Sequence, residues 1–178
     1  MSTEIDARGI DKAMKVLEKV PHAVEYATAA ALNRAVLAGR TAVSKGIRER
    51  YTIRASDIKG QVKIKRATRD DLDAVVTVSG SPIDLTNFRV RISRRGIYAQ
   101  VKKGGGGVLS RSFFMAVGKA GLYHRSSNSR LPIQREFGPS APQMAGEALV
   151  SQGVQEHMQE VFQARFEHEV MYRLEAME

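Results

Sequence analysis

The apolar positions follow a helical spacing at both ends of the chain and alternate with polar positions in the middle. Residues 24–50 are rich in alanine, and one broad face of this stretch carries larger apolar side chains; these are Leu32, Val36, Val43 and Ile47. Because alanine has the highest helix propensity, the stretch predicts a long helix. Ile10, Met14 and Leu17 predict a shorter leading helix that Pro21 interrupts.

Between residues 51 and 142 the apolar positions alternate with basic ones, which is the pattern of half-buried strands. We expect Ser56 to cap a single helical turn through Lys59. Strands are then expected at 62–67, 75–78, 88–92 and 98–101, with Arg94-Arg95-Gly96 as a hairpin connection. Further strand pairing is expected around Phe113, Phe114 and Leu122–Tyr123.

Four consecutive glycines, Gly104–Gly107, follow the fourth expected strand. They have the greatest backbone freedom of any residue and no side chain to pack. We therefore expect a mobile loop that orders only against another chain or a ligand.

A final helix is expected from about Gln143 to the C-terminus. Its apolar residues recur at every fourth position; they are Val150, Val154, Met158, Phe162, Phe166, Val170 and Leu174. Four residues advance about 400° around a helix, so this ladder drifts by roughly 240° from end to end. One flat sheet cannot cover such a stripe, and we expect a neighbouring subunit to cover part of it.

These patterns predict an α+β fold within a single domain over residues 1–178, in which an antiparallel sheet of four or more strands is flanked by a long N-terminal helix and a long C-terminal helix. The expected parts are a leading arm at 1–23, the helix at 24–50, the sheet region at 51–142 and the last helix at 143–178. A rigid junction that contacts a neighbouring ring or subunit is expected at 131–144, fixed by Pro132, Gly138, Pro139 and Pro142.

Composition narrows the chemistry. The chain has no Cys, which excludes disulfides, thiol nucleophiles and cysteine-ligated metals. It has no run of about 18 apolar residues, and its first residues are acidic rather than typical of a signal peptide. We therefore expect no membrane contact and production in a cytosol-like compartment.

Charge is distributed unevenly over the chain, whose net charge is +9. Residues 1–44 hold 6 basic and 5 acidic side chains, residues 45–136 hold 20 and 7, and residues 137–178 hold 2 and 7. The basic middle suits phosphate or an acidic protein, and the acidic tail of a neighbouring copy is one such partner.

Two surfaces follow from this distribution. The basic hairpin is expected to face a DNA channel or an acidic rim, and the residues nearest to it are Arg94, Arg95, Lys102 and Lys103. The last helix is expected to join subunits through an acidic face and its apolar ladder; the residues concerned are Glu156, Glu160, Phe162, Phe166, Glu167 and Val170.

Candidate catalytic and metal sites are poor. The four histidines lack HExxH spacing, and Asp70, Asp71 and Asp73 lack the order of a calcium loop. Lys102 and Lys103 precede the glycines, whereas a phosphate loop places its lysine after them. The serines lack a GxSxG elbow. The sequence therefore predicts no enzyme activity, no cofactor and no metal.

Sequence-independent DNA binding is a rival interpretation, because several basic residues alternate along the expected hairpin. No helix-turn-helix, zinc-finger or RRM pattern is present, and aromatic residues make up only 6% of the chain. A third interpretation is that these charges are simply the solvated face of strands.

Several stretches together resemble the prophage minor tail protein Z family. They are Ala30–Arg34, Tyr51–Arg54, Asp57–Lys59, Lys65–Ala67, Ile83–Leu85 with Phe88, Ser112–Phe114, Arg130–Ile133, Phe137–Ser140 and Pro142–Met144. The stretches span residues 27 to 175, and the segment before residue 24 and the tetraglycine match no part of the pattern.

The resemblance implies a structural virion protein of a long, non-contractile phage tail, made in the host cytoplasm, which readies the tail for joining to the filled head. It also implies a ring, of six copies by analogy with tail-completion and neck proteins, around the DNA path and beside adjacent tail or neck proteins. The alternatives are a sequence-independent DNA-binding module and a head-side connector.

Overall fold

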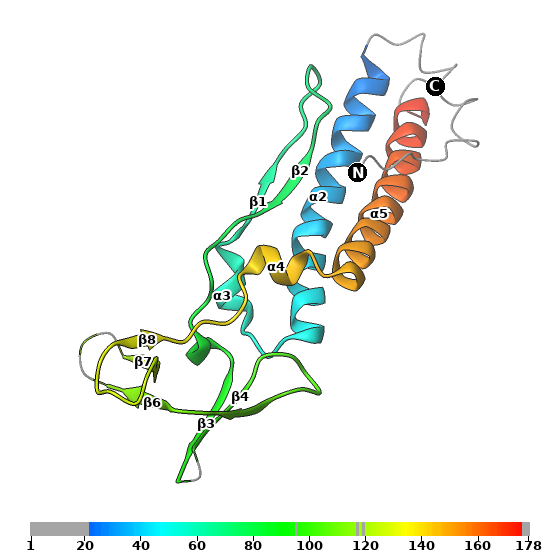
Figure 1. Ribbon diagram of the computed structural model, residues 1–178. Helices are drawn as coiled ribbons and strands as arrows, with labels where there is room; N and C mark the ends of the chain where they lie inside the picture. Colours follow the sequence, from blue (N-terminus) through cyan, green and yellow to red (C-terminus); the bar gives the residue numbers. More distant parts are fainter. Residues whose placement is uncertain (1–21, 95, 117, 119, 176–178) are drawn as a thin grey trace. The chain divides into compact units, whose positions relative to one another are not determined.

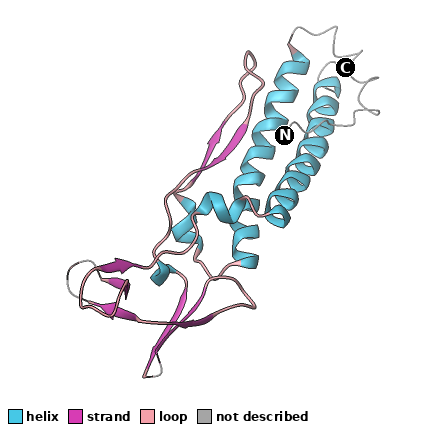
Figure 2. Ribbon diagram, viewed as in Figure 1, coloured by secondary structure: helices cyan, strands magenta, loops and turns pink. Residues whose placement is uncertain are grey.

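The protein is an α+β chain in which two long helices accompany short strands (Figures 1 and 2). The computed structural model describes residues 22–94, 96–116, 118 and 120–175. The helices are α2 (Ala23–Arg50), α3 (Ala55–Lys59), the 3-10 helix η1 (Leu85–Asn87), α4 (Ala141–Ala145) and α5 (Ala148–Glu175). The strands are β1 (Val62–Lys65), β2 (Val75–Val78), β3 (Arg89–Ser93), β4 (Gly96–Gln100), β5 (Gly107–Leu109), β6 (Ser112–Met115), β7 (Gly121–Arg125) and β8 (Ile133–Arg135).

The strands form three small sheets, in the orders β1-β2, β3-β4-β5 and β6-β7-β8. The expected sheet of four or more strands is therefore wrong for the described residues. Arg111 lies between β5 and β6 with a φ of 57°. This left-handed conformation turns the chain, and β6 pairs with β7 instead of extending the sheet of β3 to β5. The pairing expected around Phe113 and Leu122 is confirmed, because Phe113 lies opposite Tyr123 and Phe114 opposite Leu122.

The chain forms two compact units. Unit 1 comprises residues 1–42, 63–77 and 152–178, and unit 2 comprises residues 43–62 and 78–151. Both α2 and α5 contribute to each unit. The single domain expected from the sequence stays a prediction, and the expected leading helix around Ile10 to Leu17 lies outside the described residues.

In unit 1 a ladder of small residues on α2 packs against the apolar ladder of α5. Every fourth residue of α2 from 23 to 39 is small and buried; these are Ala23, Ala27, Ala31, Ala35 and Gly39. Phe166 and Val170 form one cluster with Ala23, Ala27 and Ala31. A Cβ at Gly39 would lie 2.4 Å from the sulfur of Met158. The helices therefore run antiparallel here, with small residues permitting their close approach.

The sequence places Phe162, Phe166 and Val170 of the α5 ladder at a subunit interface, but in unit 1 this part of the ladder is covered by α2 of the same chain. Phe166 is 5% exposed and Val170 is 3% exposed, and Phe162 packs against the same cluster. The reason is that α2 carries small residues with the same four-residue period. A role of α5 between subunits stays a prediction, but little of Phe166 and Val170 remains for a neighbouring copy.

Unit 1 also holds the segment after β1 against α2 through Asn33. The amide nitrogen of its side chain donates to the Ala67 carbonyl at 2.9 Å, and its oxygen accepts from the Ala67 N–H at 2.9 Å. Lys65 pairs with Asp71 at 2.9 Å and with Asp73 at 3.1 Å. Asp70 pairs with Arg69 at 2.9 Å, so all three aspartates are paired with basic side chains at a turn.

In unit 2 the strand pattern differs from the expected one at its ends. Phe88 precedes β3 as the C-cap of η1, and Ile92 is 61% exposed although it lies on the alternating apolar set. Ile97 and Ala99 of β4 are the buried pair instead. Ser56 lies inside α3, whose N-cap is Arg54 without a side-chain hydrogen bond. The expected Ser56 cap is therefore wrong.

The last helix begins later than expected, because residues 141–145 form the separate helix α4. Ser140 caps α4 in a reciprocal capping box with Gln143, and Pro142 lies in its first turn. Gly146 ends α4, and α5 starts at Ala148. Glycine has a low helix propensity and commonly ends helices, which explains a break at this point.

The junction at 131–144 is held by backbone contacts within unit 2. The Leu131–Pro132 peptide bond is cis. The Gly138 N–H donates to the Ile83 carbonyl at 2.8 Å, and Phe137 bridges to Asp84. A Cβ at Gly138 would lie 2.5 Å from the Phe88 ring, so glycine is needed for this close approach. Pro139 follows directly and leads into the Ser140 cap.

Candidate functional site

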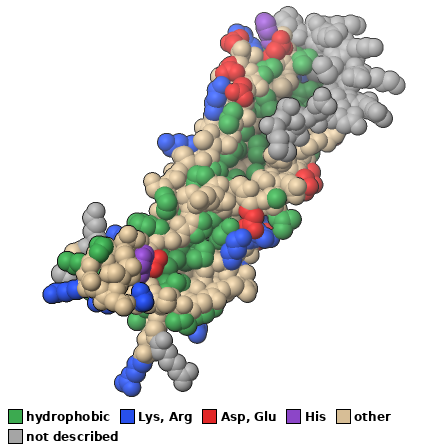
Figure 3. Space-filling model, in the orientation of Figure 1, with side chains coloured by type: hydrophobic (Ala, Val, Ile, Leu, Met, Phe, Trp, Pro, Cys, Tyr) green, Lys and Arg blue, Asp and Glu red, His purple; other side chains and the backbone are tan. Residues whose placement is uncertain are grey.

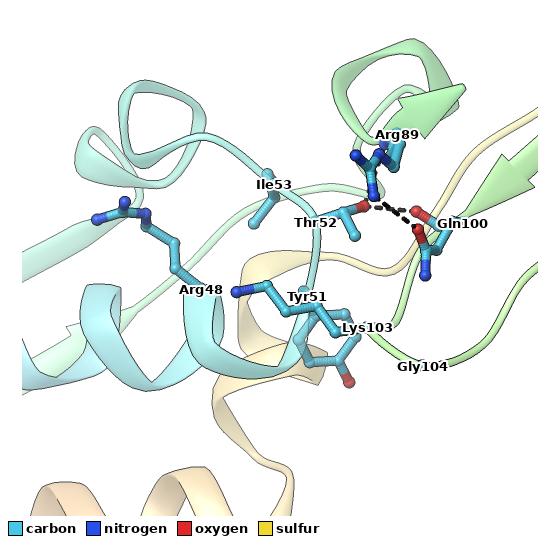
Figure 4. Close-up of a pocket in the computed structure, with 8 residues that line it drawn as sticks. All are labelled: Arg48, Tyr51, Thr52, Ile53, Arg89, Gln100, Lys103 and Gly104. Atoms are coloured by element: carbon cyan, nitrogen blue, oxygen red, sulfur yellow. Dashed lines mark hydrogen bonds between the residues drawn. The ribbon is translucent and has the colours of Figure 1, made fainter. Parts of the chain in front are cut away.

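A basic cleft lies in unit 2 between the end of α2, the start of β3 and the turn after β4 (Figure 4). Its volume is about 500 Å³. It is lined by Arg48, Tyr51, Thr52, Ile53, Arg89, Gln100, Lys103 and Gly104. We call this feature the basic cleft, because three of its side chains are cationic and none is acidic.

Thr52 organises the floor of the basic cleft. Its hydroxyl donates to the Gln100 carbonyl at 2.5 Å and accepts from the Arg89 N–H at 3.1 Å. The Thr52 N–H donates to the Val101 carbonyl at 2.9 Å, and the Lys103 N–H donates to the Arg50 carbonyl at 2.7 Å. These bonds fix the segment after α2 beside β3 and β4. The backbone positions that carry Arg48, Arg89 and Lys103 are therefore fixed relative to one another.

The cations of the basic cleft have no acidic partner among the described residues. Arg89 only approaches the Gln100 side-chain oxygen at 3.5 Å, and no ion pair within 4.0 Å involves Arg48 or Lys103 in that part of the chain. All three residues are exposed. The cleft is therefore suited to an anion with several oxygen acceptors, such as carboxylates or phosphates.

Glu147 neutralises a neighbouring group of donors. It accepts from Arg50 at 2.8 Å, from Lys102 at 3.1 Å and from the Tyr51 hydroxyl at 3.0 Å. The hydrogen bonds from Arg50 and Lys102 are the main reasons that the pKa of Glu147 falls to about 2. The cluster thus ties the end of α2 and the turn after β4 to the segment between α4 and α5.

The structure separates the four basic residues that the sequence grouped at the hairpin. Lys103 lines the basic cleft, and Arg94 is exposed at the end of the β3–β4 hairpin. Lys102 instead pairs with Glu147 and lies 5.5 Å above the Tyr51 ring. Arg95 lies outside the described residues. A part of the expected DNA-facing group is therefore engaged within the chain.

The acidic residues expected on the last helix are exposed. Glu156, Glu160 and Glu167 all lie on α5 in unit 1. We call these three residues the acidic face of α5. Glu160 lies 3.7 Å from His157, which is charged only when protonated. Basic side chains gather in the region of β6 to β8 and at the end of the β3–β4 hairpin on the face in view in Figure 3.

One polar cluster has the residue types of a hydrolase but not their arrangement. The Ser112 hydroxyl donates to Glu136 at 3.1 Å, and the His124 ring nitrogen Nδ1 lies 3.0 Å from the same carboxylate oxygen. In a catalytic triad the serine bonds to the imidazole, whereas here it bonds to the carboxylate. In the described part of the chain, no group of three potential metal-ligating side chains occurs either.

Several stretches that carry the family resemblance contain polar residues with a structural role. Asn33 binds the backbone of Ala67, and Thr52 binds that of Gln100. Asp84 accepts from Arg135; burial raises its pKa, but the bonds from Thr86 and Arg135 outweigh this and lower it. Ser140 caps α4. These polar residues thus connect segments that are far apart in the sequence.

Sequence reasoning missed two parts of this region. Arg48 was not singled out, and Glu147 was counted only within the acidic tail. Two features of the sequence could have indicated them. Arg48 lies in the last turn of a predicted helix, and Glu147 is a lone acidic residue beside the Pro/Gly turn. Neither signal shows which strands lie nearby, so the cleft itself depends on tertiary structure.

No helix in the described part of the chain has the length and apolar character needed to cross a membrane.

Comparison with curated proteins and with solved structures found no significant match. The profile of one protein family, described as prophage minor tail protein Z (GPZ), matches residues 7–177. The match therefore includes most of the leading segment and the tetraglycine, which the resemblance read from the sequence left out. Because this profile covers nearly the whole chain, the chain belongs to the prophage minor tail protein Z (GPZ) family of phage tail structural proteins.

Proposed function

We propose that the chain is a ring-forming subunit at the head-proximal end of the tail, where it completes the tail, positions the DNA and joins the tail to the filled head. The single observation that carries the proposal is the separation of charge within one tail protein. Unit 2 holds 16 basic and 5 acidic side chains, for a net +11, whereas unit 1 holds 12 and 14, for a net −2. A closed ring joins two different patches, and opposite charges suit such a contact.

The proposed partners are further copies of the chain, with six in the ring, and the adjacent tail or neck proteins. The junction at 131–144 is the proposed contact with a neighbouring ring. Leu131 and Phe137 support this, because they are large apolar side chains that are 66% and 53% exposed. The protein would be made in the host cytoplasm and end in the virion.

Deleting the coding sequence from a phage and supplying the chain from a plasmid tests this proposal. Without the chain we expect tail tubes of normal length and filled heads that remain separate, seen by electron microscopy, and a loss of infectious particles. The plasmid should restore joined particles. Normal infectivity without the chain, or short tails, would contradict the proposed place in assembly.

A DNA-binding module is the second candidate, because of the net +11 of unit 2 and the unpaired cations of the basic cleft. Native mass spectrometry with and without duplex DNA separates the two. A module would bind DNA while remaining small, and its affinity would fall steeply with salt as counterions are released. A ring subunit would give a defined oligomer, or would assemble only on tail tubes.

A further inference from the structure

We infer that the basic cleft of unit 2 receives the acidic face of α5 from an adjacent copy of the chain. This inference rests on the proposed ring and assigns its interface. The two surfaces lie in different units of the chain, so each copy offers both an acidic surface and a basic surface. That is the arrangement a head-to-tail ring requires.

The basic surface is the basic cleft. Its three cations, Arg48, Arg89 and Lys103, come from three separate segments whose backbones are joined through Thr52 and Arg50. A guanidinium presents a planar fork of donors that matches a carboxylate. The volume of about 500 Å³ admits more than one side chain. The chemistry of the cleft is therefore suited to more than one carboxylate.

The acidic surface is the acidic face of α5, which is a row of three carboxylates on one helix. Glu156 and Glu167 have no hydrogen-bond or ion-pair partner in the described part of the chain, and Glu160 has only His157. The three residues span about 16 Å along a helix axis. Glu156 and Glu160 are four residues apart, a spacing at which like charges destabilise an isolated helix. A basic partner would relieve that repulsion.

The pairing within the rest of the chain singles out this face. The other carboxylates whose side chains the structure describes pair with a basic side chain or accept a hydrogen bond, such as Glu49 with Lys45, Asp57 with Ser56 and Glu169 with Arg165. The exception is Glu25, which like Glu160 has only a histidine neighbour. Asp84, Glu136 and Glu147 are engaged in unit 2. Among the described side chains, the carboxylates without any partner are therefore Glu156 and Glu167 of α5, and the cations without an acidic partner include those of the cleft. Phosphate in the cleft would leave the α5 glutamates without a role.

Charge reversal in the full-length chain tests the pairing. A helix variant carries E156K, E160K and E167K, a cleft variant carries R48E, R89E and K103E, and a swap variant carries all six changes. All six positions are exposed, so each variant should fold, which circular dichroism verifies. A matched control carries K59E, R91E and R130E, which change the charge of unit 2 equally at exposed positions outside the cleft.

Each variant replaces the wild-type chain in a phage, and copies of the chain per purified tail are counted by quantitative mass spectrometry. We expect the helix and cleft variants each to lose about tenfold or more, a loss equivalent to about 1.4 kcal/mol. The swap variant should recover to near the wild-type number, and the matched control should stay there. Recovery identifies a contact between copies, because no other tail protein has been changed.

Three results would overturn the inference. If the helix and cleft variants each enter tails as the wild type does, or if the swap variant fails to recover, the two surfaces do not meet. A cleft variant that enters tails normally but binds duplex DNA about tenfold more weakly than the matched control would assign the cleft to phosphate. Absence of the wild-type chain from tails would instead refute the proposed function, whatever the variants do.

Discussion

At the scale of single residues, polar side chains act mainly as joints between distant segments. Asn33, Thr52 and Asp84 each bind a group more than thirty residues away. A polar group that leaves water must recover its hydrogen bonds, so such residues specify one arrangement of the backbone. Their chemistry is structural, in keeping with a tail protein.

Glu147 makes the stability of the chain depend on pH. Its pKa in the folded chain, about 2, lies below the ordinary value of 4.5, so its contribution is present above pH 4.5 and is lost as the pH falls towards 2. Replacing Glu147 with Gln should lower the free energy of unfolding at pH 7. The loss should shrink between pH 4.5 and pH 2 in urea titrations. A loss of the same size throughout that range would show that the carboxylate charge is unimportant.

Lys102 and Lys103 are neighbours with different expected roles. Lys102→Glu places a second acid beside Glu147 and breaks an ion pair of 3.1 Å, so its melting temperature should fall. Lys103→Glu is the matched control, since its exposed side chain has no ion pair within the described residues, and surface changes usually stay within about 0.5 kcal/mol. Thermal unfolding followed by circular dichroism compares them. Equal melting temperatures would mean that Lys102 is not a structural residue.

Gly138 is required by the closeness of the Phe88 ring. In Gly138→Ala the new Cβ would lie 2.5 Å from a ring carbon of a side chain that is only 5% exposed, and neither can move freely. We expect a loss of about 1–3 kcal/mol in the free energy of unfolding, measured by denaturant titration. Gly60→Ala is the control, because it has nothing within 4 Å. Similar stability of the two variants would show that the junction is loose.

At the scale of elements, the chain is built on small sheets and on helix packing between matched ladders. The four-residue ladder of small residues on α2 accepts the four-residue apolar ladder of α5 in unit 1. One consequence concerns assembly tests. Replacing Phe162 and Phe166 with Ser would remove core packing, so a failure to assemble would report on folding before it reported on an interface.

The close approach of these helices depends on Gly39. Gly39→Val would overlap Met158, because even a Cβ would lie 2.4 Å from its sulfur, and we expect about 1–3 kcal/mol of destabilisation. Gly153→Ala on α5 is the control; it meets nothing within 4 Å and should stabilise by up to about 1 kcal/mol through helix propensity. Denaturant unfolding measures both. A Gly39→Val chain as stable as the wild type would contradict the packing.

Local patterns predicted the helix at 24–50, the first three strand positions and the pairing of Phe113 with its neighbours, because these depend on propensity and on period. They did not predict how the strands divide into sheets. That division depends on single backbone conformations, such as the left-handed one of Arg111 between β5 and β6. The basic cleft was equally out of reach. Arg48 and Arg89 are 41 positions apart, and tertiary bonds such as those of Thr52 bring their segments together.

At the scale of the whole molecule, the two units differ clearly in net charge, although both long helices contribute to each of them. Unit 2 has a net charge of +11 and unit 1 of −2, counted over the full sequence. Such a charge distribution suits polyanions, and it would suit a second copy of the chain where a unit 1 surface meets a unit 2 surface; both attractions would weaken with salt. Family membership makes the tail the relevant context. Copy-to-copy contact then explains both surfaces at once, whereas DNA contact explains one.

The location of the chain in the virion tests the central claim most directly. A chain carrying an epitope tag is supplied to the deletion phage, and purified virions are imaged by cryo-electron microscopy with a gold-labelled antibody. We expect label at the tail end next to the head, and averaged images should show a ring there that is missing from tails made without the chain. Label at the distal tip, along the tube, on the capsid alone, or nowhere on the particle would contradict the account.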